Sequence, residues 1–455
     1  MPTIFAERAL LPSGWTSAVR VAVDAAGRID TVEQAARPLP DDERVAVLLP
    51  APANLHSHTF QRALAGLAER RGPAAHDSFW TWRETMYRFL DVLLPDEIEA
   101  IAALAFMEML EAGFAAVAEF HYLHHQPGGA PYADIGELSA RIGAAASAAG
   151  IGLTLLPVHY AQGGVDGRPL KGGQLRFGND LDRFTRLLDR AAALTRALPA
   201  DTRLGIAPHS LRAVGRADLA ALAGLMPGVP FHMHLAEQEG EVDETLAIHG
   251  ARPVSFLLDN FAVDTGWCLI HCTQMTADET ERLAATGAVA GLCPVTEANL
   301  GDGIFDGARY LAAGGRFGVG SDSNIRIAFN EELRQLEYSQ RLRDRARIVL
   351  ARSGESCGRR LLDLALAGGA QALGRRSGAI EAGRWADLVA LDPAALDDAA
   401  GDDGLLDHWV FCGGREAVAG VWAAGRPVVR QGRHVARDAI LARYRAALGA
   451  VRSRL

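Results

Sequence analysis

The feature that most constrains this chain is a repeated alternation of short apolar runs with longer stretches of helical periodicity. Runs rich in Val, Ile, Leu or Phe occur at residues 46–55, 115–120, 152–158, 203–208, 230–235, 267–271, 288–294 and 316–320. Strands that alternate with helices in this way pack as parallel strands joined by crossover helices. Eight such units predict an α/β fold of the (β/α)8 TIM-like barrel type. A doubly wound open sheet is the alternative, because the pattern does not show whether the sheet closes.

The segments between these runs carry helix signals. Residues 96–113 have apolar side chains at helical spacing and end at a glycine. Thr276 to Glu279 reads T-x-x-E, which is typical of a capping box, and Gly287 follows as a C-cap. We therefore expect helices over 96–113 and between Thr276 and Gly287.

The two ends of the chain have a different pattern. Short β-type runs with glycine turns occur in 15–33, 385–391 and 415–437, and an amphipathic stretch occupies 438–453. This pattern predicts a small β-sandwich domain built from both termini. The expected organisation is β-sandwich over 1–48 and 378–437, a metal-dependent barrel over 49–377 and a C-terminal helix over 438–455.

Composition narrows the class of protein. Of the 455 residues, 49% are hydrophobic and 22% are charged, which is typical of a globular chain. No apolar run is long enough to span a membrane and no secretory signal is present, so we expect a cytoplasmic protein with no membrane partner. The net charge of −9 argues against a nucleic-acid surface. The five cysteines form no C-x-x-C pair, which favours buried free thiols.

The strongest local signal is His56-Ser57-His58, directly after the first apolar run. In an extended segment residues i and i+2 point the same way, so both imidazoles can reach one metal ion. A second pair, His232 and His234, follows the fifth run. In that pair one histidine is expected to be a ligand and the other to pack in the core.

Further polar residues come where other predicted strands end. They are His209, Glu237, His271 and Asp322. Barrel enzymes place their catalytic groups at this end of the strands, so we expect these side chains to converge. Imidazole and carboxylate ligands suit Zn²⁺, and Fe²⁺ or Mn²⁺ fit the same set. Such an ion lowers the pKa of a bound water towards about 7. His271 and Asp322 are placed to take its proton, and Glu237 is a candidate proton shuttle to a leaving nitrogen.

Several motifs resemble one known family. They are NLHSHTFQRALAGLAE (54–69), DSFWTWRETMYR (77–88), AEFHYLHH (118–125), HSLRAV (209–214), HMHLAEQEGEVDE (232–244), TEANLGDGIF (296–305) and GSDSN (320–324). Together they resemble the formimidoylglutamate deiminases of the amidohydrolase superfamily over essentially the full length. The resemblance implies hydrolysis of N-formimidoyl-L-glutamate to N-formyl-L-glutamate and ammonia, a step of histidine degradation, with one zinc ion per chain and a homodimeric enzyme.

The resemblance also assigns roles to residues. The metal ligands that it implies are His56, His58, His234 and Asp322. It makes Glu237 the proton shuttle and His271 a second acid/base group. The residues that it implies for substrate binding are Gln61, Arg83, Tyr122, His209 and Arg212.

The use of basic residues agrees with this assignment. Lys171 is the single lysine, and it lies in a glycine-rich stretch before the fourth apolar run. That run ends in Pro208-His209-Ser210, so no lysine or glutamate is placed to bridge two metals, and a single metal is expected. Arginine gives a dicarboxylate substrate the bidentate contacts that lysine cannot.

Other readings stay open from the sequence. A purine or pyrimidine aminohydrolase could use the same scaffold, with amide and aromatic contacts to a base in place of paired arginines. A third interpretation is a non-enzymatic barrel that has lost its metal. Such proteins usually lack one or more metal ligands, and none of the expected ligands is missing from this sequence. His124 and His125 are expected in a loop, and Trp80 and Trp82 either wall the pocket or pack within a cover. Residues 66–95 are long for a connection, which indicates such a cover.

Overall fold

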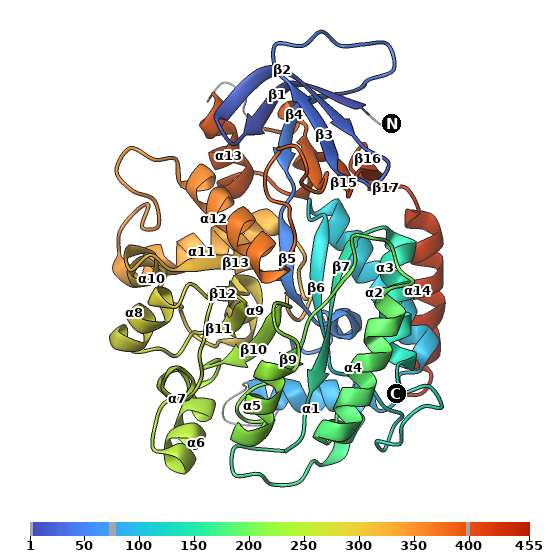
Figure 1. Cartoon of the computed structure of the whole chain (residues 1–455), viewed down its shortest axis with the longest axis vertical. Coiled ribbons are helices and arrows are strands. Elements are labelled where there is room, and N and C mark those ends of the chain that lie inside the picture. The colour runs from blue at the N-terminus through green and yellow to red at the C-terminus, as the bar shows by residue number, and fades with distance from the viewer. Residues whose placement is uncertain (1–2, 72–78, 397–400) are drawn as a thin grey trace.

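The computed structural model describes residues 3–71, 79–396 and 401–455. Figure 1 shows a larger part built of strands and helices and a smaller β-rich part at one end of the long axis. The N-terminus lies in the smaller part, and the chain ends beside the larger one.

The larger part contains two parallel sheets. The first holds β5 (Ala53–Ser57), β6 (Ala116–His121), β7 (Gly152–His159) and β8 (Arg203–Leu204), with β9 (Ala207–Pro208) also paired to β7. The second holds β10 (Phe231–Leu235), β11 (Trp267–His271), β12 (Val289–Leu292) and β13 (Arg316–Val319), in that order. Single parallel bridges, Ile206 to Phe231 and Ser57 to Asp322, join the two sheets at both edges. The predicted α/β class with parallel strands is confirmed.

Helices surround these sheets and connect successive strands (Figure 1). Those between β5 and β10 are α1 (Phe79–Leu90), α2 (Pro95–Glu111), α3 (Glu137–Ala149), α4 (Leu181–Thr195) and α5 (Arg216–Leu225). Those between β10 and β13 are α6 (Glu239–His249), α7 (Pro253–Asn260), α8 (Ala277–Ala285), α9 (Pro294–Leu300) and α10 (Gly307–Ala312). After β13 come α11 (Phe329–Asp344), α12 (Cys357–Ala372), α13 (Asp402–Phe411) and α14 (Arg437–Arg452).

The structure contains both helices that the sequence predicts. Helix α2 covers the predicted 96–113 segment as far as Glu111, two residues before the glycine expected to end it. The side chain of Thr276 accepts from the backbone N–H of Glu279 at the start of α8. Gly287 follows that helix with a φ of +73°, a conformation that glycine adopts without strain. Helix α12 packs closely on β13, since a Cβ at Gly368 would lie 1.9 Å from the backbone oxygen of Phe317.

The smaller part is one eight-stranded sheet assembled from both ends of the chain. Its order is β17-β16-β15-β14-β4-β1-β2-β3. The N-terminal strands are β1 (Thr3–Leu11), β2 (Gly14–Val23), β3 (Ile29–Glu33) and β4 (Glu43–Pro50). The C-terminal strands are β14 (Leu388–Leu391), β15 (Val418–Ala423), β16 (Arg426–Arg430) and β17 (Arg433–His434). Strand β14 pairs antiparallel with β4, so the two ends of the sequence meet at the centre of the sheet.

Some expected elements differ from the structure. The apolar run 46–55 forms two strands, because β4 ends at Pro50 in the eight-stranded sheet and β5 begins at Ala53 in the first parallel sheet. The run 203–208 is also divided, at Gly205, where a Cβ would lie 2.6 Å from the backbone oxygen of Pro230. Helix α13, which was not predicted, lies between the β-type runs expected at 385–391 and 415–437.

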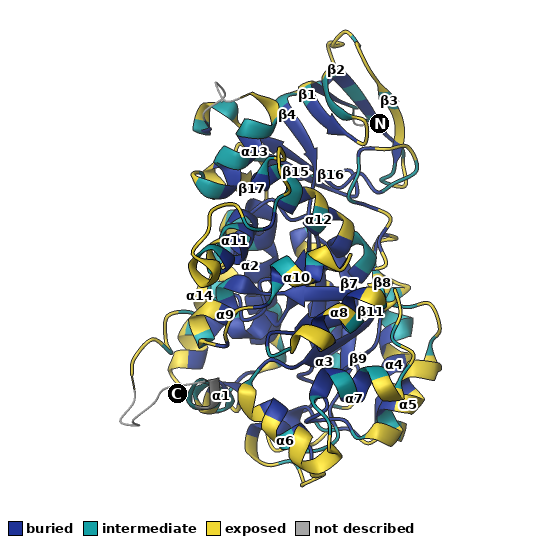
Figure 2. Cartoon of the chain, turned by 90° about the vertical axis from the view of Figure 1, so that its left-hand side faces the viewer, coloured by how far each residue is buried: buried dark blue, intermediate teal, exposed yellow. Residues whose placement is uncertain are grey.

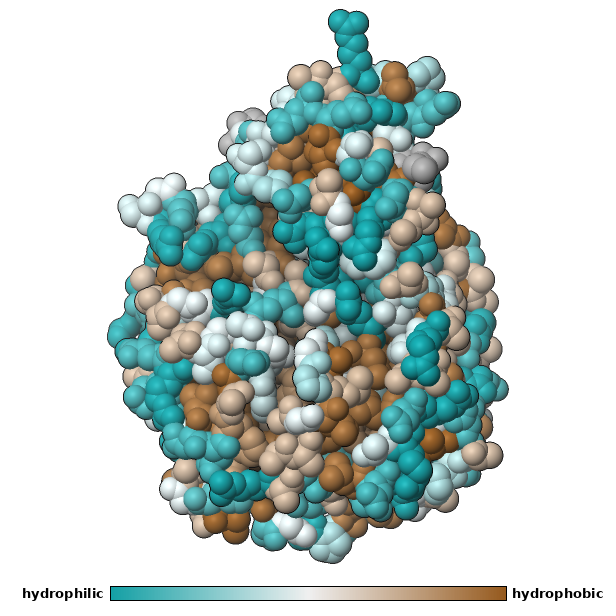
Figure 3. Space-filling model, in the orientation of Figure 1, coloured by the Kyte–Doolittle hydropathy of each residue, from teal (hydrophilic) through white to brown (hydrophobic). Residues whose placement is uncertain are grey.

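The core explains why the strands of the larger part read as continuous apolar runs. Every residue of β6, β7, β10 and β11 is buried, since both faces of each parallel sheet are covered (Figure 2). Four of the five cysteines are buried free thiols as predicted, and Cys412 is exposed. On the face drawn in Figure 3, hydrophobic residues are interspersed with polar ones. Within the described residues, no helix is both long and apolar enough to cross a membrane.

Candidate metal centre and its pocket

Two of the predicted ligands lie at the carboxyl end of β5. His56 belongs to the strand, and His58 follows it where the chain enters the short 3₁₀ helix η1 (Thr59–Leu64). Their Nε2 atoms are 3.2 Å apart, so the H-x-H spacing brings both rings to one point as expected.

Asp322 is held beside these histidines by the backbone. Its N–H donates to the carbonyl of His56 and its carbonyl accepts from the N–H of His58, both at 2.9 Å. Its φ of +42° is a left-handed conformation, which a non-glycine residue seldom adopts. This turn after β13 places Oδ1 of Asp322 3.3 Å from Nε2 of both His56 and His58.

His234, on β10, completes the group. Its Nε2 is 3.1 Å from Nε2 of His56. The Nδ1 atoms of His58 and His234 each lie 3.0 Å from a backbone carbonyl, of Phe120 and His209 respectively. A carbonyl only accepts, so each Nδ1 carries the proton and each Nε2 presents a lone pair to the centre.

The four side chains fit a divalent metal ion. Their ligand atoms all lie within 4.8 Å of one another. Ligands about 2.0–2.1 Å from a tetrahedral zinc are about 3.3 Å apart, close to the spacings seen here. Nδ1 of His56 is buried and has no hydrogen-bond partner in the described part of the chain, so no protein acceptor fixes this ring. A cation at the centre would satisfy lone pairs that otherwise face one another.

The protonation states agree with ligand chemistry. Burial lowers the pKa of His56 to about 3 and also lowers the pKa of His58 and of His234. Burial opposes the charge on Asp322, but the hydrogen bond from His56 and the nearby imidazoles hold its pKa below the usual range. Neutral imidazoles and an ionised carboxylate are the forms that bind metal.

Glu237 and His271 lie beside this centre. Oε1 of Glu237 is 3.9 Å from Nε2 of His271, and Oε2 accepts from Nη2 of Arg212 at 3.4 Å. Burial disfavours the charged form of His271, yet the carboxylate of Glu237 and the hydrogen bond with Glu297 outweigh it and raise the pKa of His271 to about 10. His271 thus holds a proton next to a carboxylate, as an acid/base pair requires.

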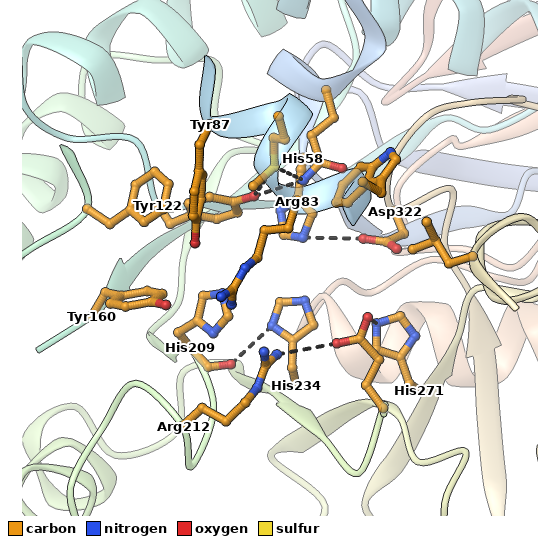
Figure 4. A pocket seen from close by; sticks show the side chains of 16 residues that line it. His58, Arg83, Tyr87, Tyr122, Tyr160, His209, Arg212, His234, His271 and Asp322 are labelled. Atoms are coloured by element: carbon orange, nitrogen blue, oxygen red, sulfur yellow. Dashed lines mark hydrogen bonds and ion pairs between the residues drawn. The ribbon is translucent and has the colours of Figure 1, made fainter. Parts of the chain in front are cut away.

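The same pocket also contains the residues expected to bind substrate. Nε2 of Gln61 donates to the hydroxyl of Tyr122 at 2.8 Å. Arg83, on α1, and Arg212, in the connection after β9, both point into the cavity, and His209 lies between Tyr160 and His234 (Figure 4). The cavity encloses about 540 Å³ of empty space, part of it open to solvent.

The structure thus brings the predicted site together. Every predicted site residue lines this pocket except His56, which lies fully buried behind it. Met86, Tyr87, Tyr160, Phe177 and Leu300 also line the pocket and were not predicted from the sequence. Three of them had a signal, since Met86 and Tyr87 are three and four residues after Arg83 on the same helix face and Tyr160 directly follows β7.

Of the remaining residues singled out in the sequence, only Trp82 lines the pocket within the described part of the chain. His124 and His125 bind backbone carbonyls, of Val158 and Gly178, and do not line the pocket. His232 bonds the carbonyl of Ala372, so it is the packing member of its pair. Trp82 lines the pocket from α1, within the expected cover, whereas the side chain of Trp80 lies outside the described residues.

Lys171 is exposed, in the connection between β7 and β8. It lies just before the 3₁₀ helix η2 (Gly172–Arg176) and does not line the pocket. No other lysine exists in the chain, so a lysine-bridged metal pair is absent from the described site.

Comparisons with known proteins bear on this geometry. Residues 47–428 match the model of the amidohydrolase family, and residues 1–46 match that of the N-terminal domain of formimidoylglutamate deiminase HutF. The chain is 51% identical over 442 residues to a formimidoylglutamate deiminase of Pseudomonas aeruginosa, covering 96% of this chain and 97% of that protein.

Two further relatives extend the comparison. A crystal structure of an amidohydrolase from Brucella melitensis superposes with a TM-score of 0.95 at 49% identity, covering 99% of this chain and 100% of that one. An 8-oxoguanine deaminase of Pseudomonas aeruginosa is 29% identical, over 89% of this chain and 87% of that protein. The chain therefore belongs to the amidohydrolase family, and within it to the formimidoylglutamate deiminases.

Proposed function

We propose that this protein is a zinc-dependent iminohydrolase that converts N-formimidoyl-L-glutamate to N-formyl-L-glutamate and ammonia in histidine degradation. The observation that carries the proposal is one pocket that holds both a metal-ligand group and two arginines. His58, His234 and Asp322 line this pocket, and Arg83 and Arg212 point into the same cavity (Figure 4).

The ligands are proposed to be His56, His58, His234 and Asp322, with one zinc ion per chain. A divalent ion held by them supplies a Lewis acid and a water of lowered pKa. Fe²⁺ and Mn²⁺ also bind imidazole and carboxylate sets of this kind, so metal content is part of the test.

The protein's own groups then account for the hydrolysis. Glu237 is proposed to take a proton as water adds to the formimidoyl carbon and to pass it to the imine nitrogen. It then carries the remaining hydroxyl proton of the adduct to the same nitrogen, so that the C–N bond breaks, the carbonyl forms and ammonia leaves. His271, 3.9 Å away, stabilises the charge that changes on this carboxylate. Because Glu237, His271 and Asp322 are all buried, bulk water competes little with these transfers.

The dicarboxylate part of the substrate is proposed to bind to the arginines of the same pocket. Guanidinium groups pair with carboxylates in a bidentate way, and Arg83 and Arg212 are two such groups in one cavity. Gln61, Tyr122 and His209 add neutral donors beside them. A purine or pyrimidine aminohydrolase has no need for two arginines at this position, so they favour the formimidoyl amino acid.

The test is ammonia release by the zinc-loaded protein from N-formimidoyl-L-glutamate, measured beside guanine and cytosine. We expect turnover of the first alone, and loss of that turnover in Glu237→Gln. Ammonia from a base but not from the amidine would overturn the substrate assignment. If no ammonia is released from any of the three compounds, the assignment of an enzymatic function would be overturned.

We also propose the closed barrel, the β-sandwich part and the domain bounds that the sequence predicts. The two parallel sheets, bridged at both edges, support a (β/α)8 barrel over 49–377. The terminal strands support a β-sandwich part over 1–48 and 378–437, with a C-terminal helix over 438–455. The resemblance further supports a cytoplasmic homodimer.

A further inference from the structure

The motif TEANLGDGIF (296–305) has no role in the scheme above, although it is among the segments that resemble the deiminase family. It follows β12, and its first residues belong to α9. Glu297 in this helix is buried with 5% exposure and does not line the pocket. A buried carboxylate next to an active site needs partners, and those of Glu297 are informative.

One oxygen of Glu297 has two donors. Oε1 accepts from the backbone N–H of Cys293 at 2.9 Å and lies 3.3 Å from Nδ1 of His271. The bond to Cys293 fixes the carboxylate against its own helix start. The carboxylate is therefore a fixed acceptor behind the His271 ring.

This contact determines which face of the imidazole meets the reaction. An ionised carboxylate only accepts, so Nδ1 of His271 carries a proton. The opposite atom, Nε2, then faces the pocket, 3.9 Å from Oε1 of Glu237. The backbone of His271 has a φ of +70°, so the chain turns sharply where this ring must be aimed.

A second metal is the competing interpretation of these residues, because ligand atoms of His271, Cys293 and Glu297 lie within 4.8 Å of one another. Two observations argue against it. Oε1 of Glu297 is already used by an N–H of the backbone and by the imidazole. Burial raises the pKa of the Cys293 thiol well above its usual value, so binding a metal through this sulfur would first require the loss of a firmly held proton.

We propose that Glu297 is a positioning residue for the reaction: it holds the Nδ1 edge of His271 and so presents Nε2 to the reacting atoms beside Glu237. This inference rests on the proposed hydrolytic function of the pocket. It assigns a role to the motif that the ligand set and the arginines leave unused.

Glu332 offers a matched control. It is also a buried glutamate, on α11, and it accepts from the backbone N–H of Val295 in the same helix, α9, at 3.0 Å. It does not line the pocket and, within the part of the chain that the structure describes, makes no hydrogen bond or ion pair with His271. Any general loosening of α9 should therefore follow from changing either glutamate, whereas loss of ring orientation should follow only from changing Glu297.

The experiment compares Glu297→Ala, Glu297→Gln, Glu332→Ala and Glu332→Gln in the zinc-loaded enzyme. We expect Glu297→Ala to lower kcat by about 100-fold or more, as loss of a carboxylate that orients a catalytic histidine does. KM, zinc content and melting temperature should stay near those of the unchanged protein. Glu297→Gln keeps an acceptor oxygen and should recover a large share of kcat, and the Glu332 variants should keep kcat within about twofold.

A crystal structure of Glu297→Ala gives a readout that does not depend on turnover. The His271 ring is expected to rotate or to occupy more than one orientation, while the four zinc ligands keep their places. A ring that stays fixed, a kcat unchanged in Glu297→Ala, equal losses in the Glu332 variants, or loss of a second bound metal would each overturn the proposal. If the wild-type protein does not hydrolyse N-formimidoyl-L-glutamate, only the substrate assignment is contradicted. The orientation of the His271 ring can still be compared between crystal structures of Glu297→Ala and the wild-type protein.

Discussion

Two clusters of charged and ionisable side chains, buried except for the half-exposed Arg426, lie at opposite ends of the parallel strands. At the carboxyl ends are His56, His58, His234 and Asp322. At the amino ends, Arg375 bonds Asp387 at 2.6 Å and Asp201 at 3.1 Å, and Arg426 bonds Asp201 at 2.7 Å. We call the second group the arginine–aspartate cluster. It joins the start of β8 to β14 and β16 of the eight-stranded sheet.

The two clusters differ in whether their own side chains balance charge and match hydrogen-bond donors with acceptors. In the arginine–aspartate cluster two guanidinium groups face two carboxylates, so charges and donors match. In the metal centre three imidazoles face one carboxylate, and two pairs of ring nitrogens lie only 3.1–3.2 Å apart. A buried group whose lone pairs converge without enough donors indicates a missing cation, whereas a balanced one indicates a structural link.

The largest effect should come from removing one ligand. His234→Asn is expected to lose zinc and to lower turnover by at least about 10⁴-fold, because only a bound ion brings the pKa of water from 15.7 towards about 7. His232→Asn is the matched control, since it changes an equally buried histidine two residues away that bonds a backbone carbonyl. Metal analysis and ammonia release check both, and full zinc content in His234→Asn would remove this residue from the ligand set.

Glu237→Gln should separate metal binding from chemistry. The amide keeps the shape of the side chain but cannot carry a proton between water and the leaving nitrogen. We expect zinc content to be unchanged and kcat to fall by about 10²–10⁴-fold, the usual contribution of a proton-transfer group. Turnover close to that of the unchanged enzyme would refute the shuttle.

Arg375→Met tests the other cluster. It leaves two buried carboxylates, of Asp201 and Asp387, with fewer partners, and breaking such a buried pair costs about 3–5 kcal/mol. The free energy of unfolding in urea should fall by that amount, while KM and zinc content of the folded fraction stay unchanged. A loss of zinc in this variant would show that the two ends of the strands are coupled.

Substitution of the arginines at the pocket should have a smaller effect and one limited to binding. Arg83→Ala is expected to raise KM by about 10- to 100-fold, because a charge-assisted hydrogen bond contributes about 1.5–3 kcal/mol. Arg212→Ala should also lower kcat, since Arg212 contacts Glu237 at 3.4 Å. Steady-state kinetics with metal analysis measure this, and zinc loss equal to the loss of binding would contradict the assigned role.

The sequence predicted which side chains the structure gathers into the metal-ligand group better than it predicted the lining of the pocket. His56 and His234 lie near the ends of strands and His58 and Asp322 follow strands, and strand order alone brings such residues together. The lining residues Phe177 and Leu300 come from connections whose path depends on tertiary packing, so no local pattern marks them. Tyr87 was open to prediction through its i+4 spacing from Arg83.

The arginine–aspartate cluster had no sequence signal. Arg375 is one of many arginines, and Asp201, Asp387 and Arg426 lie far from it in the chain or follow no strand end. The division of 46–55 into β4 and β5 was also missed, because a continuous apolar run looks the same whether it serves one sheet or two. Both errors concern how the two parts of the molecule join.

The smallest expected effect is the pH dependence of the stabilisation that Asp201 of the arginine–aspartate cluster contributes. Burial opposes the charge on Asp201, but the hydrogen bond from Arg426 and the charge of Arg375 outweigh it, so its pKa lies below the usual 3.8. The stabilisation is therefore complete above about pH 4 and is lost as pH falls through the lowered pKa. His121, buried with a pKa lowered from 6.5 to about 3, destabilises the folded state over a higher range, from pH 6.5 down to about 3.

Asp201→Asn should consequently show a constant loss of unfolding free energy between pH 7 and 5. Below about pH 4 the difference from the unchanged protein should narrow, by at most about 1.4 kcal/mol per pH unit for one proton. Urea unfolding at several pH values measures both ranges. If the difference in unfolding free energy between Asp201→Asn and the wild-type protein narrowed between pH 7 and 5, the prediction would be wrong. An aspartate of lowered pKa does not titrate in that range, so the pH dependence would then come from a buried histidine.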